Sequence, residues 1–271
     1  MFFPDNIDFI QSKTYILSIR LMPSGFYFSI HSPTDSTVFF QNNVLFSKNI
    51  SYLKNIEKLI FDFSFFSNNF REINVIYVND KLTLVPAEFY NKKLIDELLA
   101  FNHHSFENKV MSNNIDKLGC RLIWGMNAEL YSFLNRTLLN PRFSNHLAFL
   151  MPFFNKLHDK TTAALYINFN DDEMIDAIAF SNEKLILAKT FQAKNSLEAC
   201  YYIQKTWEVL NLDAHSDKIF FSGKTEKNKT CIDTIKKLIP QSKKLFVELA
   251  SELKIDQSET PTEILYQLCE L

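Results

Sequence analysis

Two stretches of this 271-residue chain repeat the same order of short strands, and this repetition constrains the fold more than any other feature. Residues 161–192 have the pattern of three strands joined by two polar turns, and residues 14–42 have the same pattern at a similar length. Aligning Arg20 with Asn168 gives an offset of 148 residues, and this offset also brings Val38 onto Ile186. The pattern therefore predicts two similar halves, each beginning with an antiparallel meander.

Helical and buried-strand patterns follow each meander in a similar order. The first predicted helix begins after Asn49 or Ser51, and an apolar helix over residues 145–157 is expected to connect the halves. The other predicted helices lie over residues 86–101, 128–139, 195–210 and 226–239, and a last helix starts at the capping-box pair Thr260 and Glu263. The remaining predicted strands lie over residues 73–78, 111–116, 120–124, 219–221 and 245–249. We therefore expect an α/β fold with a cleft between two mixed-sheet halves, residues 1–157 and 158–271.

Composition excludes several classes of protein. Hydrophobic residues make up 46% and charged residues 22%, which is ordinary for a globular protein, and the net charge of -2 gives no general attraction to nucleic acid. The longest apolar run is too short to cross a membrane, and the N-terminus lacks a secretory leader pattern, so a cytoplasmic location is expected. The four cysteines are widely separated, which favours buried thiols over zinc binding or disulfides.

The twofold order of meander, helix, strand, helix and strand around a buried helix resembles the actin-like ATPase superfamily, which includes actin, Hsp70 and the sugar kinases. The sequence LIWGM at residues 122–126, with the helix after it, is similar to the pilus-assembly and cell-division actin homologues. The chain also resembles an uncharacterised Bacteroidetes family of unknown function with a degenerate actin-like fold. The resemblance covers almost the whole chain and implies a duplicated, ribonuclease H-like fold.

In that superfamily ATP lies between the halves, and the resemblance implies two Asp-x-Gly turns that hold its phosphates and magnesium. Here the first turn has Arg20 and Met22 in those two places, followed by Pro23, which has no N–H to donate. The second turn has Asn168 and Asn170. Neither turn provides the carboxylate or the bare backbone that the chemistry needs. We therefore expect no conventional ATP hydrolysis, no metal and no cofactor.

The resemblance also implies a third turn, which holds the adenosine, and the turn between the strand at residues 219–221 and the next helix partly keeps it. A lysine and a hydroxyl at a helix start could hold phosphate, although a plain strand-to-helix turn explains the same residues. The candidate cleft residues are therefore Ser222, Gly223, Lys224, Thr225, Arg20 and Asn168.

Other clusters have ordinary explanations beside functional ones. The acidic run at residues 171–173 with Asp176 is interpreted as a solvated turn, with a divalent cation as the alternative. His158 and Asp159 are neighbours in sequence that usually diverge, so we expect no acid–base pair. The seven lysines between residues 224 and 244 indicate a solvated face or a docking surface for an acidic partner. Phenylalanines at residues 61–66 indicate core packing or an exposed apolar patch.

Two functions follow as hypotheses. The first is a non-catalytic interaction or scaffold protein whose cleft has lost its metal and phosphate groups and which binds an unidentified protein partner. The alternative is a nucleotide-binding protein or ATPase that uses Arg20 and Lys224 as phosphate cations.

Overall fold

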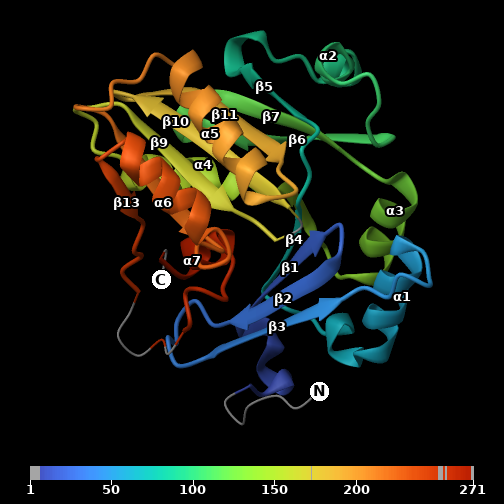
Figure 1. Ribbon diagram of the computed structural model, residues 1–271. Helices are drawn as coiled ribbons and strands as arrows, with labels where there is room; N and C mark the ends of the chain where they lie inside the picture. Colours follow the sequence, from blue (N-terminus) through green and yellow to red (C-terminus); the bar gives the residue numbers. More distant parts are fainter. Residues whose placement is uncertain (1–6, 172, 250–252, 254, 270–271) are drawn as a thin grey trace.

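The computed structural model describes residues 7–171, 173–249, 253 and 255–269, and its described strands form three sheets (Figure 1). The N-terminal sheet has the strand order β3 (Phe39–Leu45), β2 (Gly25–His31), β1 (Ile16–Met22), β4 (Glu72–Tyr77) and β8 (Arg142–Asn145). The C-terminal sheet has the order β11 (Lys184–Gln192), β10 (Met174–Ser181), β9 (Ala164–Phe169), β12 (Lys218–Gly223) and β13 (Ser242–Lys244). The two sheets thus share one connectivity.

The pairing directions of the two sheets also agree. In each sheet the first three strands in sequence form an antiparallel meander, and the next two strands join it in parallel. Arg20 lies on the central strand β1, opposite Tyr27 and Ile76. Asn168 occupies the corresponding place on β9, opposite Asp176 and Ser222. The predicted α/β fold of two mixed-sheet halves is confirmed.

Side-chain caps fix the starts of several helices. Ser51, Asn127 and Asn195 each accept a backbone N–H from the first turn of the helix that follows. The described α-helices are α1 (Tyr52–Asp62), α2 (Ile95–Asn102), α3 (Ala128–Thr137), α4 (Leu147–Leu157), α5 (Ser196–Val209), α6 (Lys229–Leu238) and α7 (Thr262–Cys269). None of these helices is long and apolar enough to cross a membrane.

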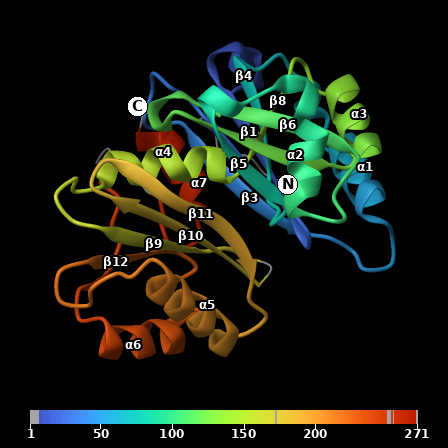
Figure 2. The same cartoon turned by 90° about the horizontal axis from the view of Figure 1, so that it is seen from above.

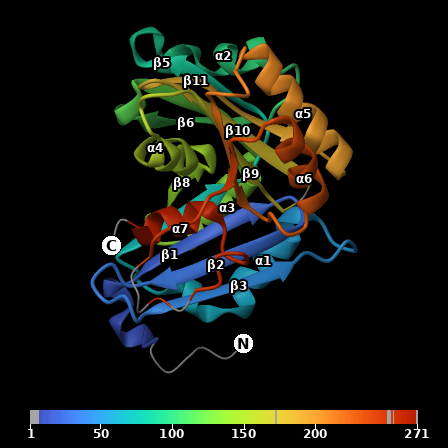
Figure 3. The same ribbon diagram turned by 60° about the vertical axis from the view of Figure 1, so that its left-hand side comes forward.

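Helices cover the C-terminal sheet on both faces, as Figure 2 shows. Helices α5 and α6 pack on one face, where Ala199, Ile203 and Ile235 enter the core. Helix α4 packs on the other face, where Phe154 stacks on Tyr166 at 4.9 Å. Helix α7 lies beside α4, between the two halves of the molecule (Figure 3). The last helix of the chain therefore returns to the N-terminal half.

A smaller antiparallel sheet lies between β4 and β8 in sequence. Its strand order is β5 (Leu82–Pro86), β7 (Cys120–Met126) and β6 (Lys109–Ile115). Trp124 is fully buried here, donates its indole N–H to Asn113 at 2.8 Å and stacks on Tyr77. This buried contact fixes the small sheet against the N-terminal sheet.

Several predicted boundaries were wrong because tertiary pairing overrides local pattern. The helix expected over residues 86–101 begins only at Ile95, since residues 82–86 pair with β7 as a strand and short 3-10 turns follow. The four-residue strand β8 was missed because it is defined only by its pairing with β4. The last strand lies at Ser242–Lys244 rather than over residues 245–249.

Candidate functional site

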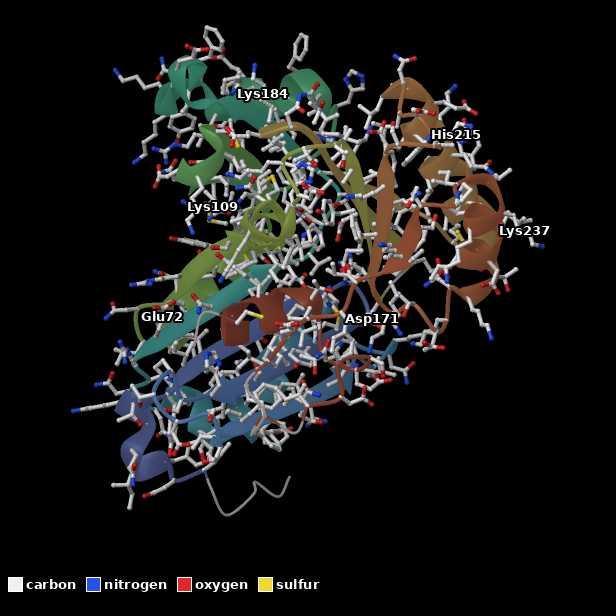
Figure 4. All side chains as sticks on the ribbon, turned by 90° about the vertical axis from the view of Figure 1, so that its left-hand side faces the viewer. Glu72, Lys109, Asp171, Lys184, His215 and Lys237 are labelled. Atoms are coloured by element: carbon white, nitrogen blue, oxygen red, sulfur yellow. The ribbon has the colours of Figure 1, made fainter. Side chains whose placement is uncertain are left out.

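Polar side chains from both halves meet where α7 begins, and we call this group the interhalf cluster. Figure 4 shows this junction with Asp171, which lines it, labelled beside the start of α7. Within the described chain these side chains are almost fully buried, which is costly unless they are hydrogen-bonded. The cluster consists of Arg20, His146, Asn168, Asn170, Asp176, Thr190, Ser222, Thr262 and Glu263.

Arg20 connects β1 to the C-terminal half and to α7. Its side chain is 2% exposed, and its Nε lies 3.2 Å from Oε1 of Glu263, whose side chain is 0% exposed. One terminal nitrogen donates to Oδ1 of Asn170 at 2.7 Å. The arginine that replaces the expected carboxylate therefore holds a carboxylate from the chain's own last helix.

Asn168 lies at the centre of the cluster and bonds in two directions. Its Oδ1 accepts from the hydroxyls of Thr262 at 2.6 Å and Ser222 at 3.0 Å. Its amide nitrogen donates to Asp176 at 3.0 Å and to Asn170 at 3.2 Å. Both polar atoms of this side chain are thus hydrogen-bonded within the protein.

Asp176 is completely buried on β10 and is the main acceptor of the cluster. Its Oδ1 accepts from Thr190 at 2.7 Å and lies 2.8 Å from Nε2 of His146, while its Oδ2 accepts from the amides of Asn168 and Asn170. Burial alone raises the pKa of Asp176, but the charge of His146 and these hydrogen bonds outweigh it and hold the pKa below its ordinary value. Asp176 is therefore an ionised structural anchor with four partners.

The turn after β12 approaches the cluster closely. Gly223 has φ +72°, and a Cβ built there would lie 2.2 Å from the carbonyl oxygen of Phe169. Lys224 follows, and its ammonium donates to Glu259 Oε2 at 2.9 Å and to two backbone carbonyls of residues 258 and 259. The Thr225 hydroxyl is buried and has no partner among the described residues. Glycine is needed here for close strand contact, and the lysine binds the segment that leads into α7.

The centre of the interhalf cluster has almost no free space. The cavity lined by Arg20, Asn168, Lys224, Thr262 and Glu263 is about 10 Å³. Small-molecule sites in proteins are about 300–1,000 Å³, so this cavity is at the scale of a single water molecule. Larger cavities adjoin it, one of about 390 Å³ lined by Ser222, Gly223 and Thr262 and one of about 320 Å³ lined by Asn170 and Asp171. A cavity of about 640 Å³ lies between the starts of α1 and α3.

The residues present do not fit the magnesium nucleotide that the fold family implies. Arg20 puts a cation where the fold family would place a carboxylate. Of the carboxylates of the described cluster, Asp176 has both oxygens and Glu263 has one oxygen bound to other cluster residues. In the described part of the chain, no three His, Cys, Asp or Glu side chains gather in a way that could hold a metal ion. No catalytic step through such a group follows from this geometry.

The structure brings most of the candidate residues together. Arg20, Asn168 and Ser222 belong to the interhalf cluster, and Gly223 and Lys224 line the same small cavity. Thr225 lies one residue further along the turn. The sequence did not indicate His146 or the hydrogen bond from Arg20 to Asn170. It also did not indicate that Thr262 and Glu263 bind Asn168 and Arg20. Asp176 carried a usable signal, since a single acid inside the apolar run MIDAIAF indicates a buried polar site.

The other sequence clusters make the following contacts. Nε2 of His158 lies 2.8 Å from the carbonyl of Asn182, whereas Asp159 binds Lys218 at 2.8 Å. Phe65 and Phe66 are buried in the core, and Phe61 remains 70% exposed. Asp171 lies 3.8 Å from Lys227, and Asp172 is outside the described residues. Lys224 and Lys244 form ion pairs with Glu259 and Glu226.

Comparison with known proteins supports the same fold. A structure from Bacteroides thetaiotaomicron, described as a protein with an actin-like ATPase fold and unknown function, is 27% identical with a TM-score of 0.81, covering 88% of this chain and 93% of that one. A PilM-PilN type IV pilus biogenesis complex (TM-score 0.55) and the cytoplasmic domain of EpsL from the Vibrio cholerae type II secretion system (0.52) are each 9% identical and cover 94% of both chains.

No curated protein matches the chain. The family described as "Protein of unknown function (DUF3822)" matches residues 4–241. With the strand order and the structural likeness above, the conclusion is that this chain belongs to the DUF3822 family and has an actin-like ATPase fold.

Proposed function

We propose that this chain is a pseudo-ATPase, a non-catalytic interaction or scaffold protein of the cytoplasm that uses an actin-like fold to bind a protein partner. The proposal treats its two halves, residues 1–157 and 158–271, as a duplicated unit, supported by the shared strand order of the two sheets. Helix α7 belongs to the second half in sequence and links it to the first.

One observation carries the proposal: the chain's own C-terminal segment occupies the place between the halves. Thr262 binds Asn168, and Glu263 binds Arg20, with both α7 side chains buried. Ser18 donates to Gln267 at 2.6 Å, which adds a contact along β1. These bonds join the residues that would otherwise face a ligand, which supports a structural rather than catalytic role for the cleft.

The charge pattern supports the same conclusion. A metal-bound triphosphate is strongly anionic, and it would have to displace Glu263 from Arg20 and Glu259 from Lys224 before it met either cation. Releasing Glu263 would expose a buried carboxylate and leave its former site unpaired, which opposes binding. A protein of this fold in the PilM-PilN complex takes part in a protein assembly, although likeness at 9% identity concerns the fold alone.

A thermal-shift screen of nucleotides tests the proposal against its alternative, a nucleotide-binding protein or ATPase with Arg20 and Lys224 as phosphate cations. The native chain, Arg20→Ala and Lys224→Ala are each heated with ATP, ADP, GTP and AMP, with and without magnesium. The proposal predicts no nucleotide-dependent shift in any of the three. A shift in the native chain that is lost in Lys224→Ala, which keeps the buried cluster intact, would establish the alternative, because a ligand that binds the folded state raises its melting temperature.

A further inference from the structure

The N-terminal sheet has an open edge at β3. Figures 1 and 3 show β3 at the outer margin of this sheet, with β2 on one side and no described strand on the other. Edge strands expose a row of unpaired backbone N–H and C=O groups that can pair with another strand.

The hydrogen-bond register of β3 determines which of its residues face the open edge. Ser32 donates to the carbonyl of Val38 at 3.2 Å, and Phe46 donates to the carbonyl of Ser24 at 2.8 Å. Paired residues of an antiparallel ladder exchange hydrogen bonds at every second position, so the even-numbered residues from 38 to 46 bond to β2. The odd-numbered residues direct their backbone groups to the open edge, where no described residue pairs with them. They are Phe39, Gln41, Asn43 and Leu45.

The side chains of β3 give no protection against pairing. Its sequence, FFQNNVL, contains no charge, proline or glycine, and Leu45 is 74% exposed. The edges of the C-terminal sheet differ, because β11 carries Lys184 and Lys189 and β13 carries Lys243 and Lys244. Lysine on an edge strand is a common device against strand addition. Lysines thus disfavour strand addition at β11 and β13, whereas β3 has no such residue.

The same sequence is complementary to itself when read in the opposite direction. Two apolar residues, three amides and two apolar residues follow one another, so the pattern is symmetric about Asn42. In an antiparallel pair with its twofold axis at Asn42, Phe39 lies opposite Leu45 of the second copy, and Gln41 lies opposite Asn43 of the second copy. All four outward-facing residues then form hydrogen-bonded pairs, with apolar side chains beside apolar ones and amides beside amides.

We propose that two copies of this chain pair through β3, antiparallel about Asn42, and join their N-terminal sheets into one continuous ten-stranded sheet. Such a contact is isologous and closes after two copies, so it gives a discrete dimer. The occupant is a second copy because a charge-free strand with this symmetric pattern satisfies its own edge. The pairing uses backbone groups at the edge of β3, whereas the segment before α7 contacts the Gln41 side chain, whose Oε1 accepts from the Thr260 hydroxyl at 2.8 Å.

Sedimentation velocity of the full chain, with matched variants at Asn43, tests the proposal. The native chain should have the sedimentation coefficient of a dimer, with twice the mass of one copy. Asn43→Pro removes one outward N–H from each copy without touching a bond to β2, and it should give monomers. Asn43→Thr keeps the N–H in a residue that favours strands, and it should remain a dimer. A native monomer at all concentrations, or a dimer unaffected by proline, would overturn the proposal.

A cysteine at the axis tests the register and does not require the proline variant to fold. Asn42 faces itself in a non-hydrogen-bonded pair, where Cα atoms are about 4.5 Å apart and within disulfide reach. Asn42→Cys should therefore give a covalent dimer under mild oxidation, beyond any shown by the native chain. Asn43→Cys, offset by two residues from its symmetry mate, should not. No cross-link at Asn42, or equal cross-linking at both positions, would contradict the pairing.

Discussion

The buried contact between Arg20 and Glu263 leads to a quantitative prediction about stability. Replacing Arg20 by methionine keeps most of the side-chain volume and removes the guanidinium. Glu263 would then be a carboxylate with 0% exposure and no cation beside it, and Asn170 would lose its donor. Breaking a buried ion pair by removing one partner costs about 3–5 kcal/mol, since the remaining charge stays out of water.

A second Arg–Glu pair on the same sheet is a matched control. Arg142 and Glu72 lie closer together, at 2.7 Å, but their side chains are 70% and 29% exposed. Because exposed pairs are worth about 0.2–1 kcal/mol, Arg142→Met should change stability by no more than that. The two substitutions are chemically identical and differ in burial, so the difference between them isolates the effect of the interhalf cluster.

Urea unfolding followed by circular dichroism measures both variants and the double variant Arg20→Met with Glu263→Gln. We predict that Arg20→Met lowers the free energy of unfolding by about 3–5 kcal/mol. The double variant should lose less than the sum of the two single losses, because the charges are coupled. If Arg20→Met alone is too unstable to purify, the double variant should recover folding. A loss below about 1 kcal/mol for Arg20→Met would refute the docking of α7 on β1, since that is the value of an exposed pair.

Three further predictions follow from the geometry. Gly223→Ala should lower the free energy of unfolding in urea by about 3 kcal/mol, because it combines a left-handed backbone with overlap onto Phe169. Gly119→Ala, with φ +61° and open space around it, should cost about 1 kcal/mol. Equal costs would contradict the close approach of Gly223 to Phe169. Burial lowers the pKa of His31 to about 4, so between pH 6.5 and 4 the unfolded chain binds a proton that the folded chain does not, and stability should fall by about 3 kcal/mol across that window. His31→Gln should lose this part of the pH dependence, and an unchanged difference between its unfolding curves at pH 7 and pH 4.5 would refute the assignment. The β3 dimer should withstand a high salt concentration, because no charged side chain lies on that strand; dissociation by salt would contradict it.

The fold could be predicted from sequence where the signal is local and repeated. Alternating apolar residues and turn residues placed both meanders, and the offset between Arg20 and Asn168 matches their positions on the central strands β1 and β9. Elements that exist only through pairing could not be found this way. Strand β8 has four residues and no pattern of its own. Strand β5 was not predicted, and its last residue, Pro86, was assigned to a helix, because its pairing with β7 is not visible locally.

The sequence indicated the candidate residues on the strands, but it did not indicate the residues that α7 contributes. Arg20, Asn168 and Ser222 lie near the C-terminal ends of β1, β9 and β12, and the proximity of Asn168 to Ser222 follows from the parallel pairing of β9 with β12. Glu263 was interpreted as a capping residue for Thr260, because the spacing of a capping box is local. In the structure the Thr260 N–H donates to Asp256 and the Glu263 carboxylate binds Arg20, a partner 243 positions away in sequence. No local rule could choose between those two roles.

Calorimetry tests whether the last helix fills the place between the halves and prevents nucleotide binding there. Magnesium ATP is titrated into the full chain while phosphate release is followed in the same sample. We predict no heat of binding and no phosphate release even at millimolar ATP. Micromolar binding that requires magnesium, accompanied by turnover, would contradict it.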